Sequence, residues 1–143
     1  MEQAQAFPGP EIRPALDALG LEFLAGILEV EVGRNPGNLA ALAELGHVYT
    51  RSLRFEKGLD VDLELVRRCP QDPTAHYNLA CSLSLLGRTG PALDSLERSV
   101  ELGYEDLEHL LADEDLAGVR GESRFQSLAR RLGAALDSSS GPG

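Results

Sequence analysis

Four side chains near the C-terminal end of the sequence are of the types that bind metal ions. His109 and Asp113 stand four residues apart, a spacing at which two ligands share one face of a helix. Glu114 and Asp115 follow directly. We expect Asp113 to lie beyond the end of its helix, where these acids would cap a short helix over 115–120 instead. The sequence therefore predicts no metal site and no cofactor.

Cys81 and His47 are the other residues whose types suggest chemistry. A thiol beside an imidazole can act as a nucleophile. The two residues fall at the same place in two successive helical units. Helices packed side by side are about 10 Å apart, which is too far for a short hydrogen bond. No nucleophile elbow, phosphate-binding loop or zinc-binding helix motif is present either. We predict that the protein is not an enzyme.

Composition narrows the class of protein further. The chain has 143 residues, of which 43% are apolar, so it can form one domain with a buried core. Its net charge of −10 argues against binding to nucleic acid. Residues 1–14 resemble no signal peptide, and no run of about 18 apolar residues could span a membrane. Only two cysteines occur, which suits a reducing compartment, so we expect a cytoplasmic protein.

We expect helices to position the candidate residues named above. No segment shows sustained alternation of polar and apolar residues, so we expect no β-sheet. Gly and Pro residues interrupt the helical segments at short intervals. Asn38, Asp72 and Thr89 are candidate helix N-caps. We expect residues 1–10 and 137–143 to be disordered tails. The expected helices run near 11–19, 21–34, 39–52, 55–68, 73–86 and 90–102.

The chain partly matches itself when it is shifted so that Leu45 aligns with Leu79 and Gly46 with the equally small Ala80. The shift is about 34 residues, a helix–turn–helix period that is typical of tetratricopeptide repeats, and the sequence resembles that family. The residues that match the family pattern are Leu42, Leu45, Gly46, Tyr49, Gly58, Asp62 and Pro70 in one copy, and His76, Leu79, Ala80, Leu83, Ala92, Leu96 and Tyr104 in the next.

The resemblance implies an all-α fold, a right-handed α-solenoid of antiparallel helix hairpins. The single domain would cover 11–136. Its units would be a degenerate repeat over 11–36, full repeats over 39–72 and 73–104, and capping helices over 105–136. The last segment resembles the end-group of many bacterial members of the family, with Phe125, Leu128, Leu132 and Leu136 on its apolar face.

One departure concerns the second helix of the first full repeat. Asp62 stands where the family usually has an aromatic residue. Leu59, Leu63 and Val66 share a helical face, so we expect this helix to be rotated with these three residues inward.

The resemblance also implies a ligand groove on the first helices of the repeats. Some family members bind a chaperone's C-terminal carboxylate with Lys, Asn and Asn at three groove positions. Here the corresponding residues are Ala43, His47 and Asn78, so only one matches and that activity is not expected. The groove residues implied are His47, Thr50, Arg51, Thr74, Tyr77, Asn78, Cys81 and Ser84.

Three functions remain as hypotheses. The first is a non-catalytic adaptor that binds a peptide or helix of another protein, neutral or basic, in a shallow concave groove. The second is self-association into a homodimer through the N-terminal helices, because the helix over 21–34 is apolar on more than one face. An enzyme or a metal-binding protein has the least support.

Overall fold

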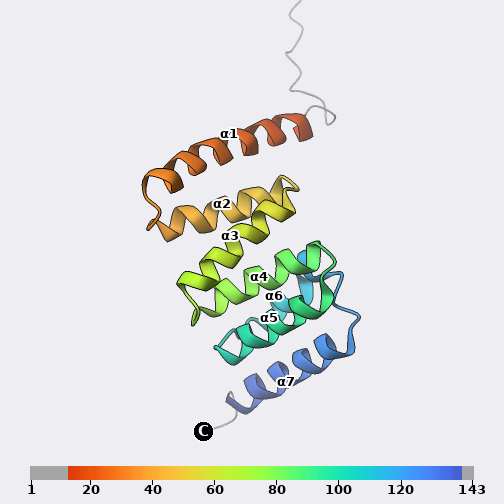
Figure 1. The fold of residues 1–143 in the computed structure, drawn as a ribbon. Coiled ribbons are helices and arrows are strands. Elements are labelled where there is room, and N and C mark those ends of the chain that lie inside the picture. The colour runs from red at the N-terminus through yellow and green to blue at the C-terminus, as the bar shows by residue number, and fades with distance from the viewer. Residues whose placement is uncertain (1–12, 140–143) are drawn as a thin grey trace, which may run out of the picture.

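Helices account for nearly the whole of the computed structural model, which describes residues 13–139. Within this range the protein is all-α and contains no strand. Figure 1 shows a stack that runs from α1 at one end to α7 at the other, with α6 drawn between α4 and α5 in this view. They are α1 (Arg13–Arg34), α2 (Leu39–Arg51), α3 (Phe55–Arg68), α4 (Pro73–Leu85), α5 (Thr89–Glu101), α6 (Leu107–Ala112) and α7 (Ser123–Ser139), with a 3-10 turn, η1, at Glu114–Leu116.

Two of the helix pairs, α2–α3 and α4–α5, repeat each other. Helix α4 begins and ends one repeat period after α2, and α5 begins one period after α3. The predicted caps at Asn38 and Asp72 are confirmed, because their side chains accept hydrogen bonds from the backbone N–H of Ala41 and Thr74. The cap predicted at Thr89 is wrong, because α5 already begins there and Arg88 is the N-cap residue.

The turns inside the two hairpins are also alike. Leu53 and Gly87 follow α2 and α4 at equivalent positions, and both have left-handed backbone conformations, with φ of 63° and 73°. Glycine adopts this conformation freely, whereas leucine does so at a cost. The two turns therefore share one backbone conformation, although leucine at position 53 does not favour it.

The first helix shows part of the same repeat. Arg54 forms an ion pair with Glu22 of α1, just as Arg88 forms one with Glu56 of α3. The end of α1 at Arg34 also lies one repeat period before the end of α3. The last turns of α1 therefore correspond to the second helix of a hairpin.

The predicted break at Gly20 is wrong. The expected helices 11–19 and 21–34 form one continuous helix over the described residues from Arg13 to Arg34. Gly inside a helix costs only about 1 kcal/mol relative to Ala, and a long helix tolerates it. No hairpin is therefore seen in the described part of 11–36.

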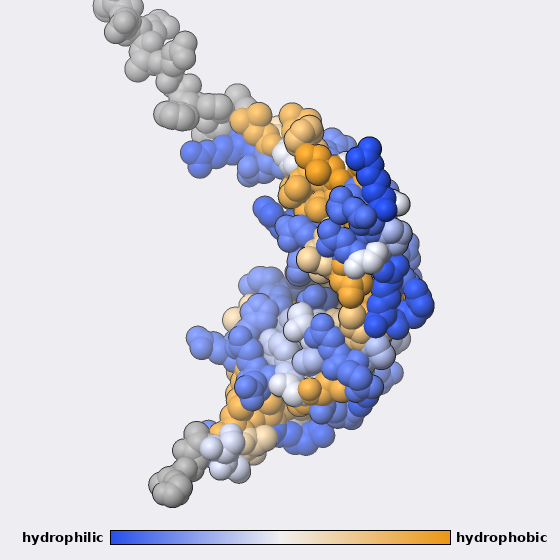
Figure 2. Space-filling model, turned by 90° about the vertical axis from the view of Figure 1, so that its left-hand side faces the viewer, coloured by the Kyte–Doolittle hydropathy of each residue, from blue (hydrophilic) through white to orange (hydrophobic). Residues whose placement is uncertain are grey.

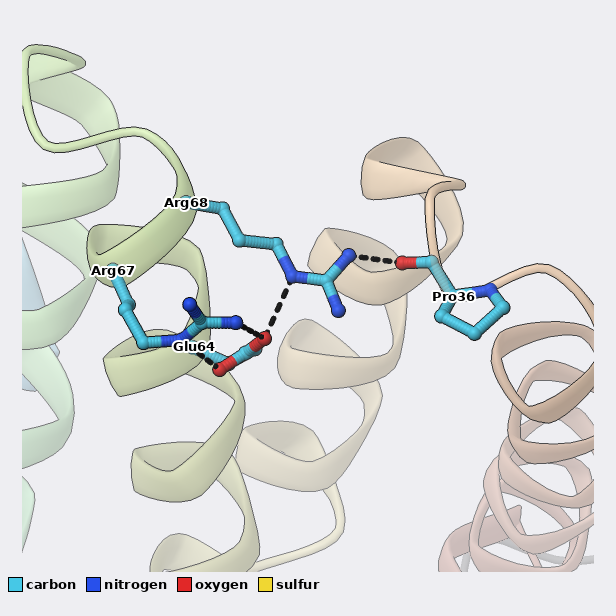
Figure 3. Close-up of polar contacts among 4 residues, drawn as sticks. All are labelled: Pro36, Glu64, Arg67 and Arg68. Carbon is cyan, nitrogen blue, oxygen red and sulfur yellow. Dashed lines mark hydrogen bonds and ion pairs between the residues drawn. The ribbon is translucent and has the colours of Figure 1, made fainter.

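Arg68 links α3 to the loop between α1 and α2. Figure 3 shows its side chain lying between Glu64 and the backbone carbonyl of Pro36, and donating a hydrogen bond to each. Hydrogen bonds from Arg67 and then Arg68 lower the pKa of Glu64 to about 2. The second helix of one unit is thereby tied to the turn of the preceding one.

The orientation of α3 differs from the prediction. Asp62 is buried, with only 6% of its surface exposed, whereas Leu63 is 49% exposed. The inward residues of this helix are Gly58, Leu59, Val61, Asp62 and Leu65. Positions 58, 61, 62 and 65 form one helical stripe, so the helix keeps the orientation of the repeat and carries an acid into the interior.

The core consists of two clusters. One joins α1, α2 and α3 with Ala75 of α4. The other joins α4, α5 and the C-terminal segment (residues 105–139) with Leu59 of α3, and Val66 packs against both clusters. The predicted capping face is confirmed for Phe125, Leu128 and Leu132, which α7 buries. This helix continues to Ser139, into the predicted tail. The rest of that tail, 140–143, and the predicted tail at 1–10 lie outside the described residues.

The assembled helices form a crescent. Figure 2 shows its outline, hollowed along one side, with mostly hydrophilic residues around the hollow. Hydrophobic residues gather near the end that carries α1. No helix within residues 13–139 is long and apolar enough to cross a membrane.

Candidate functional site

A cavity of about 250 Å³ lies where the two hairpins meet the C-terminal segment. The first helices of both hairpins, α2 and α4, form two of its walls. The turn of chain from α6 to η1 forms another, and α3 contributes one residue. The lining residues are Gly46, His47, Thr50, Asp62, Tyr77, Asn78, Cys81, Ser82, His109, Asp113 and Asp115.

Small residues in the first hairpin let the walls of this pocket approach each other. A Cβ atom on Gly46 would lie 3.0 Å from Cγ1 of Val61 in α3. A Cβ on Gly58 would lie 3.2 Å from Oγ1 of Thr50. Ala80, the equivalent of Gly46, is fully buried in the second hairpin. Close packing of α2 on α3 thus brings Asp62 to the floor of the pocket.

Asp113 organises the wall formed by the C-terminal segment. It ends α6 and caps η1, and its Oδ1 accepts a hydrogen bond from the backbone N–H of Asp115. Its Oδ2 accepts a 2.7 Å hydrogen bond from the Tyr77 hydroxyl and a weaker one, at 3.7 Å, from the Cys81 thiol. The His109 Nε2 lies 3.2 Å from the same oxygen. One carboxylate therefore ties the C-terminal segment to α4.

Aromatic packing supports the same junction. The ring of Tyr77 stacks on that of Tyr104, with centroids 4.4 Å apart, and contacts the His109 ring at 5.5 Å. The prediction that Asp113 lies beyond the helix end and acts as a cap is confirmed.

Asp62 is the second carboxylate of the pocket. Its Oδ2 accepts a 2.5 Å hydrogen bond from the Ser82 hydroxyl. Its Oδ1 accepts no hydrogen bond from any described residue. Burial raises the pKa of Asp62 to about 6, although the Ser82 hydrogen bond and the nearby His47 both lower it. At neutral pH the group is therefore a buried anion with one neutral hydrogen-bond donor.

The pocket is acidic. Asp62, Asp113 and Asp115 line it, and none of its described lining residues is Lys or Arg, although Arg120 behind the wall donates a hydrogen bond to the backbone carbonyl of Asp113. The two histidines, His47 and His109, are the basic groups in its walls. Burial, followed by the charge of Asp113, raises the pKa of Asp115. A pocket of this composition attracts positive charge.

The thiol of Cys81 is poorly suited to nucleophilic catalysis. Burial, and then the charges of Asp113 and Asp115, raise its pKa well above the ordinary value. The thiolate, which is the reactive form, is therefore disfavoured. Within the described residues the thiol points to Asp113 and makes no hydrogen bond with His47.

Three of the lining residues also have the spacing of metal ligands. One ligand atom from each of Cys81, Asp113 and Asp115 lies within 4.8 Å of the others. Thiolate, carboxylate and imidazole are donors that zinc accepts. A metal bound here would have to displace the thiol proton and the Tyr77 hydrogen bond to Asp113, so the present contacts do not favour it.

The structure brings five of the eight predicted groove residues to this pocket, namely His47, Thr50, Tyr77, Asn78 and Cys81. The other three lie elsewhere. Thr74 is exposed at the start of α4. Ser84 is buried, and its hydroxyl has no hydrogen-bond partner. Arg51 lies beside a separate hollow between the end of α2 and the first turns of α1.

Sequence reasoning missed the acids that define the pocket. It predicts Asp62 to be rotated outward, and Asp113 and Asp115 to serve as caps. Only the fold shows that the C-terminal segment returns to α4. One signal was present, since a charged residue at the position of an inward aromatic indicates a buried polar contact. Comparison with known proteins finds neither a family nor a curated relative that matches this chain.

Proposed function

We propose that this protein is a non-catalytic interaction module, and that the hollow side of its crescent binds an extended segment or a helix of another protein. The observation that carries the proposal is the pocket, which opens between equivalent helices of two successive hairpins. Repeated helices create a continuous surface along which a chain of another protein can lie. A pocket on such a surface would anchor one side chain of that partner.

The chemistry of the pocket supports binding more than catalysis. Its thiol is held as a neutral group and its central carboxylate, Asp113, is occupied by Tyr77 and His109. A catalytic base needs a free lone pair within reach of substrate, which Asp113 does not offer, although Asp62 keeps one oxygen without a partner among the described residues. These groups instead form a rigid polar wall, which is typical of a recognition surface.

Selection from a displayed peptide library tests the proposal. The protein is immobilised, and the enriched peptides are then measured against two variants. Asn78→Trp fills the mouth of the pocket, whereas Asp60→Trp adds the same bulk to an exposed position of α3 outside the pocket lining. We expect the first variant to weaken binding at least tenfold and the second to leave it unchanged. Equal effects, or no enriched peptide, would contradict the proposal.

A specific observation also favours self-association. The described part of α1 exposes a stripe of five large apolar side chains, and Phe23 is 73% exposed. Their spacing puts them on one helical face. Contiguous apolar patches larger than a few hundred Å² are rare on monomers and mark interfaces. The stripe consists of Leu16, Leu19, Phe23, Ile27 and Val30.

Light scattering at several concentrations tests this second candidate. If α1 pairs with its counterpart in a second copy, the protein is dimeric at micromolar concentration and Phe23→Glu makes it monomeric. Leu63→Glu, at an exposed leucine of α3, is the matched control and should leave the dimer intact. A protein that is monomeric at all concentrations rules out the homodimer.

A further inference from the structure

We propose that the pocket between α2, α4 and the C-terminal segment receives the side chain of one arginine from the bound partner. This inference rests on the proposed function, because it names the chemistry of the partner at that same site. Three features of the described residues carry it: the charge of the lining, the unpaired oxygen of a buried acid, and the size of the cavity.

The charge comes from separate elements. Asp62 belongs to α3, whereas Asp113 and Asp115 belong to the C-terminal segment. They converge on one cavity whose described lining contains no Lys or Arg. Elsewhere in the molecule, acids that lie near arginines are paired, as Glu64 is with Arg67 and Asp94 with Arg124. The pocket therefore concentrates negative charge with no strong base in its described lining, and the nearby Arg120 bonds to the backbone carbonyl of Asp113 and forms no ion pair with an acid of the lining.

Asp62 is the most specific feature. Only 6% of the surface of this residue is exposed, and it lines the pocket with one oxygen bonded to Ser82 and the other bonded to no described residue. A buried carboxylate is costly unless it is paired, and a neutral hydroxyl compensates little of that cost. A guanidinium entering the pocket would supply both the missing donor and the missing charge.

The size of the cavity favours a side chain over a larger ligand or a bare ion. Sites for small molecules usually measure about 300–1,000 Å³, so a cavity of 250 Å³ holds little more than one long side chain. Arginine is planar, donates five N–H bonds and packs against aromatic rings. Tyr77, Asn78 and His109 provide an aromatic and polar lining for such a group.

Nuclear magnetic resonance titration of the isotope-labelled protein tests the inference. The probe is Nα-acetyl-arginine N-methylamide, and its neutral isostere, the corresponding citrulline derivative, is the ligand control. We expect the arginine probe to shift the backbone amide signals of His47, Asp62 and Cys81 with a dissociation constant on the order of 1 mM, as for a single anchoring group. The citrulline probe should bind at least tenfold more weakly.

Asp62→Asn is the decisive variant, because it preserves shape and can still bond to Ser82. We expect it to weaken the arginine probe at least tenfold. Asp60→Asn removes the same charge from an exposed position of the same helix and should change the affinity less than twofold. A native-like amide spectrum of Asp62→Asn shows that the variant is folded. Equal affinity for the arginine and citrulline probes, or an unchanged affinity in Asp62→Asn, would overturn the inference.

A cobalt titration separates this inference from a metal site. A thiolate–cobalt absorption band that disappears in Cys81→Ser, together with no response to the arginine probe, would assign the pocket to a metal instead. The peptide selection remains an independent test. Peptides that Asn78→Trp blocks but that lack arginine would contradict the inference and leave the proposed function standing. A pocket that binds the arginine probe while no peptide is selected would contradict the proposed function alone.

Discussion

The two ends of this helical stack are built differently. The described part of α1 has 22 residues and buries only Ala25. At the other end, α7 has 17 residues and buries Phe125, Leu128 and Leu132. A stack of helices exposes apolar surface at its ends unless a terminal element covers it. The C-terminal end is therefore closed, whereas the described residues leave the outer face of α1 open.

The same difference explains how the pocket between the two hairpins is completed. His47 and Cys81 occupy equivalent positions of α2 and α4, and the C-terminal segment places η1 against α4. Asp113 then reaches Tyr77 and Cys81 from that segment. The C-terminal segment therefore serves two purposes: it covers the core, and it completes the acidic wall of the pocket.

The largest effect should come from comparing the two ends by truncation. Phe125 is 1% exposed, so Phe125→Ala leaves a cavity and should lower the free energy of unfolding by about 3–5 kcal/mol. Phe23→Ala at the open end should change it by no more than about 0.5 kcal/mol. Urea unfolding at low protein concentration measures both. Similar losses at the two ends would mean that α1 is covered after all.

The next effect concerns the pocket between the ends. Asp62 has a folded-state pKa of about 6, above its ordinary value of 3.8. The folded state therefore holds this proton more tightly, and stability falls as the pH rises from about 4 to about 6. Asp62→Asn removes that loss and should stabilise the protein by up to about 3 kcal/mol at pH 7.5.

Urea unfolding at two pH values measures this effect. The gain in Asp62→Asn should be present at pH 7.5 and vanish near pH 4, where the aspartate is protonated in the folded state and no longer carries the buried charge. A variant that is less stable than the parent at pH 7.5 would show that the buried charge is already compensated.

A smaller effect should separate the two hairpin turns. Leu53→Gly relieves a left-handed leucine and should stabilise the protein by about 1 kcal/mol. The reciprocal change, Gly87→Leu, should destabilise it by a similar amount. Thermal unfolding of the two variants, compared with the parent, gives the signs. If both variants changed the stability in the same direction, the two turns would not be equivalent.

The smallest effect is expected at the surface of the first hairpin. Glu64→Gln weakens the contacts with Arg67, which is largely open to solvent, and with Arg68, which is partly exposed. Ion pairs exposed to water contribute little, and salt screens them further. Thermal unfolding in low and high salt should show a minor loss that disappears in high salt. A loss larger than the gain in Leu53→Gly would show that the Arg68 link to Pro36 has a structural role.

The hairpins were predictable from sequence because their signals are local. The caps at Asn38 and Asp72 and the period of the repeat depend on residues that are close in the chain. The path of the chain after α5 was not predictable in the same way. Asp113 meets Tyr77 only because α6 and η1 return to α4, a contact between distant residues that no local pattern specifies.

Two errors have the same origin, which is a local rule that the surrounding structure overrides. Glycine often ends helices, but the residues around Gly20 favour a helix strongly enough to continue through it. Acids usually lie at the surface, yet packing of α3 against α2 and α4 places Asp62 inside. Ser82 supplies one hydrogen bond to the buried carboxylate, which offsets part of the cost of this burial.

Amide hydrogen exchange on the complex with the tightest displayed peptide tests the central claim most directly. Exchange is measured by mass spectrometry on the protein alone and on the saturated complex. Binding on the hollow side predicts slower exchange in α2, in α4 and in the segment from α6 to η1, with no change in α1. Protection confined to α1 would contradict the account, because it would assign the binding surface to the open end of the stack.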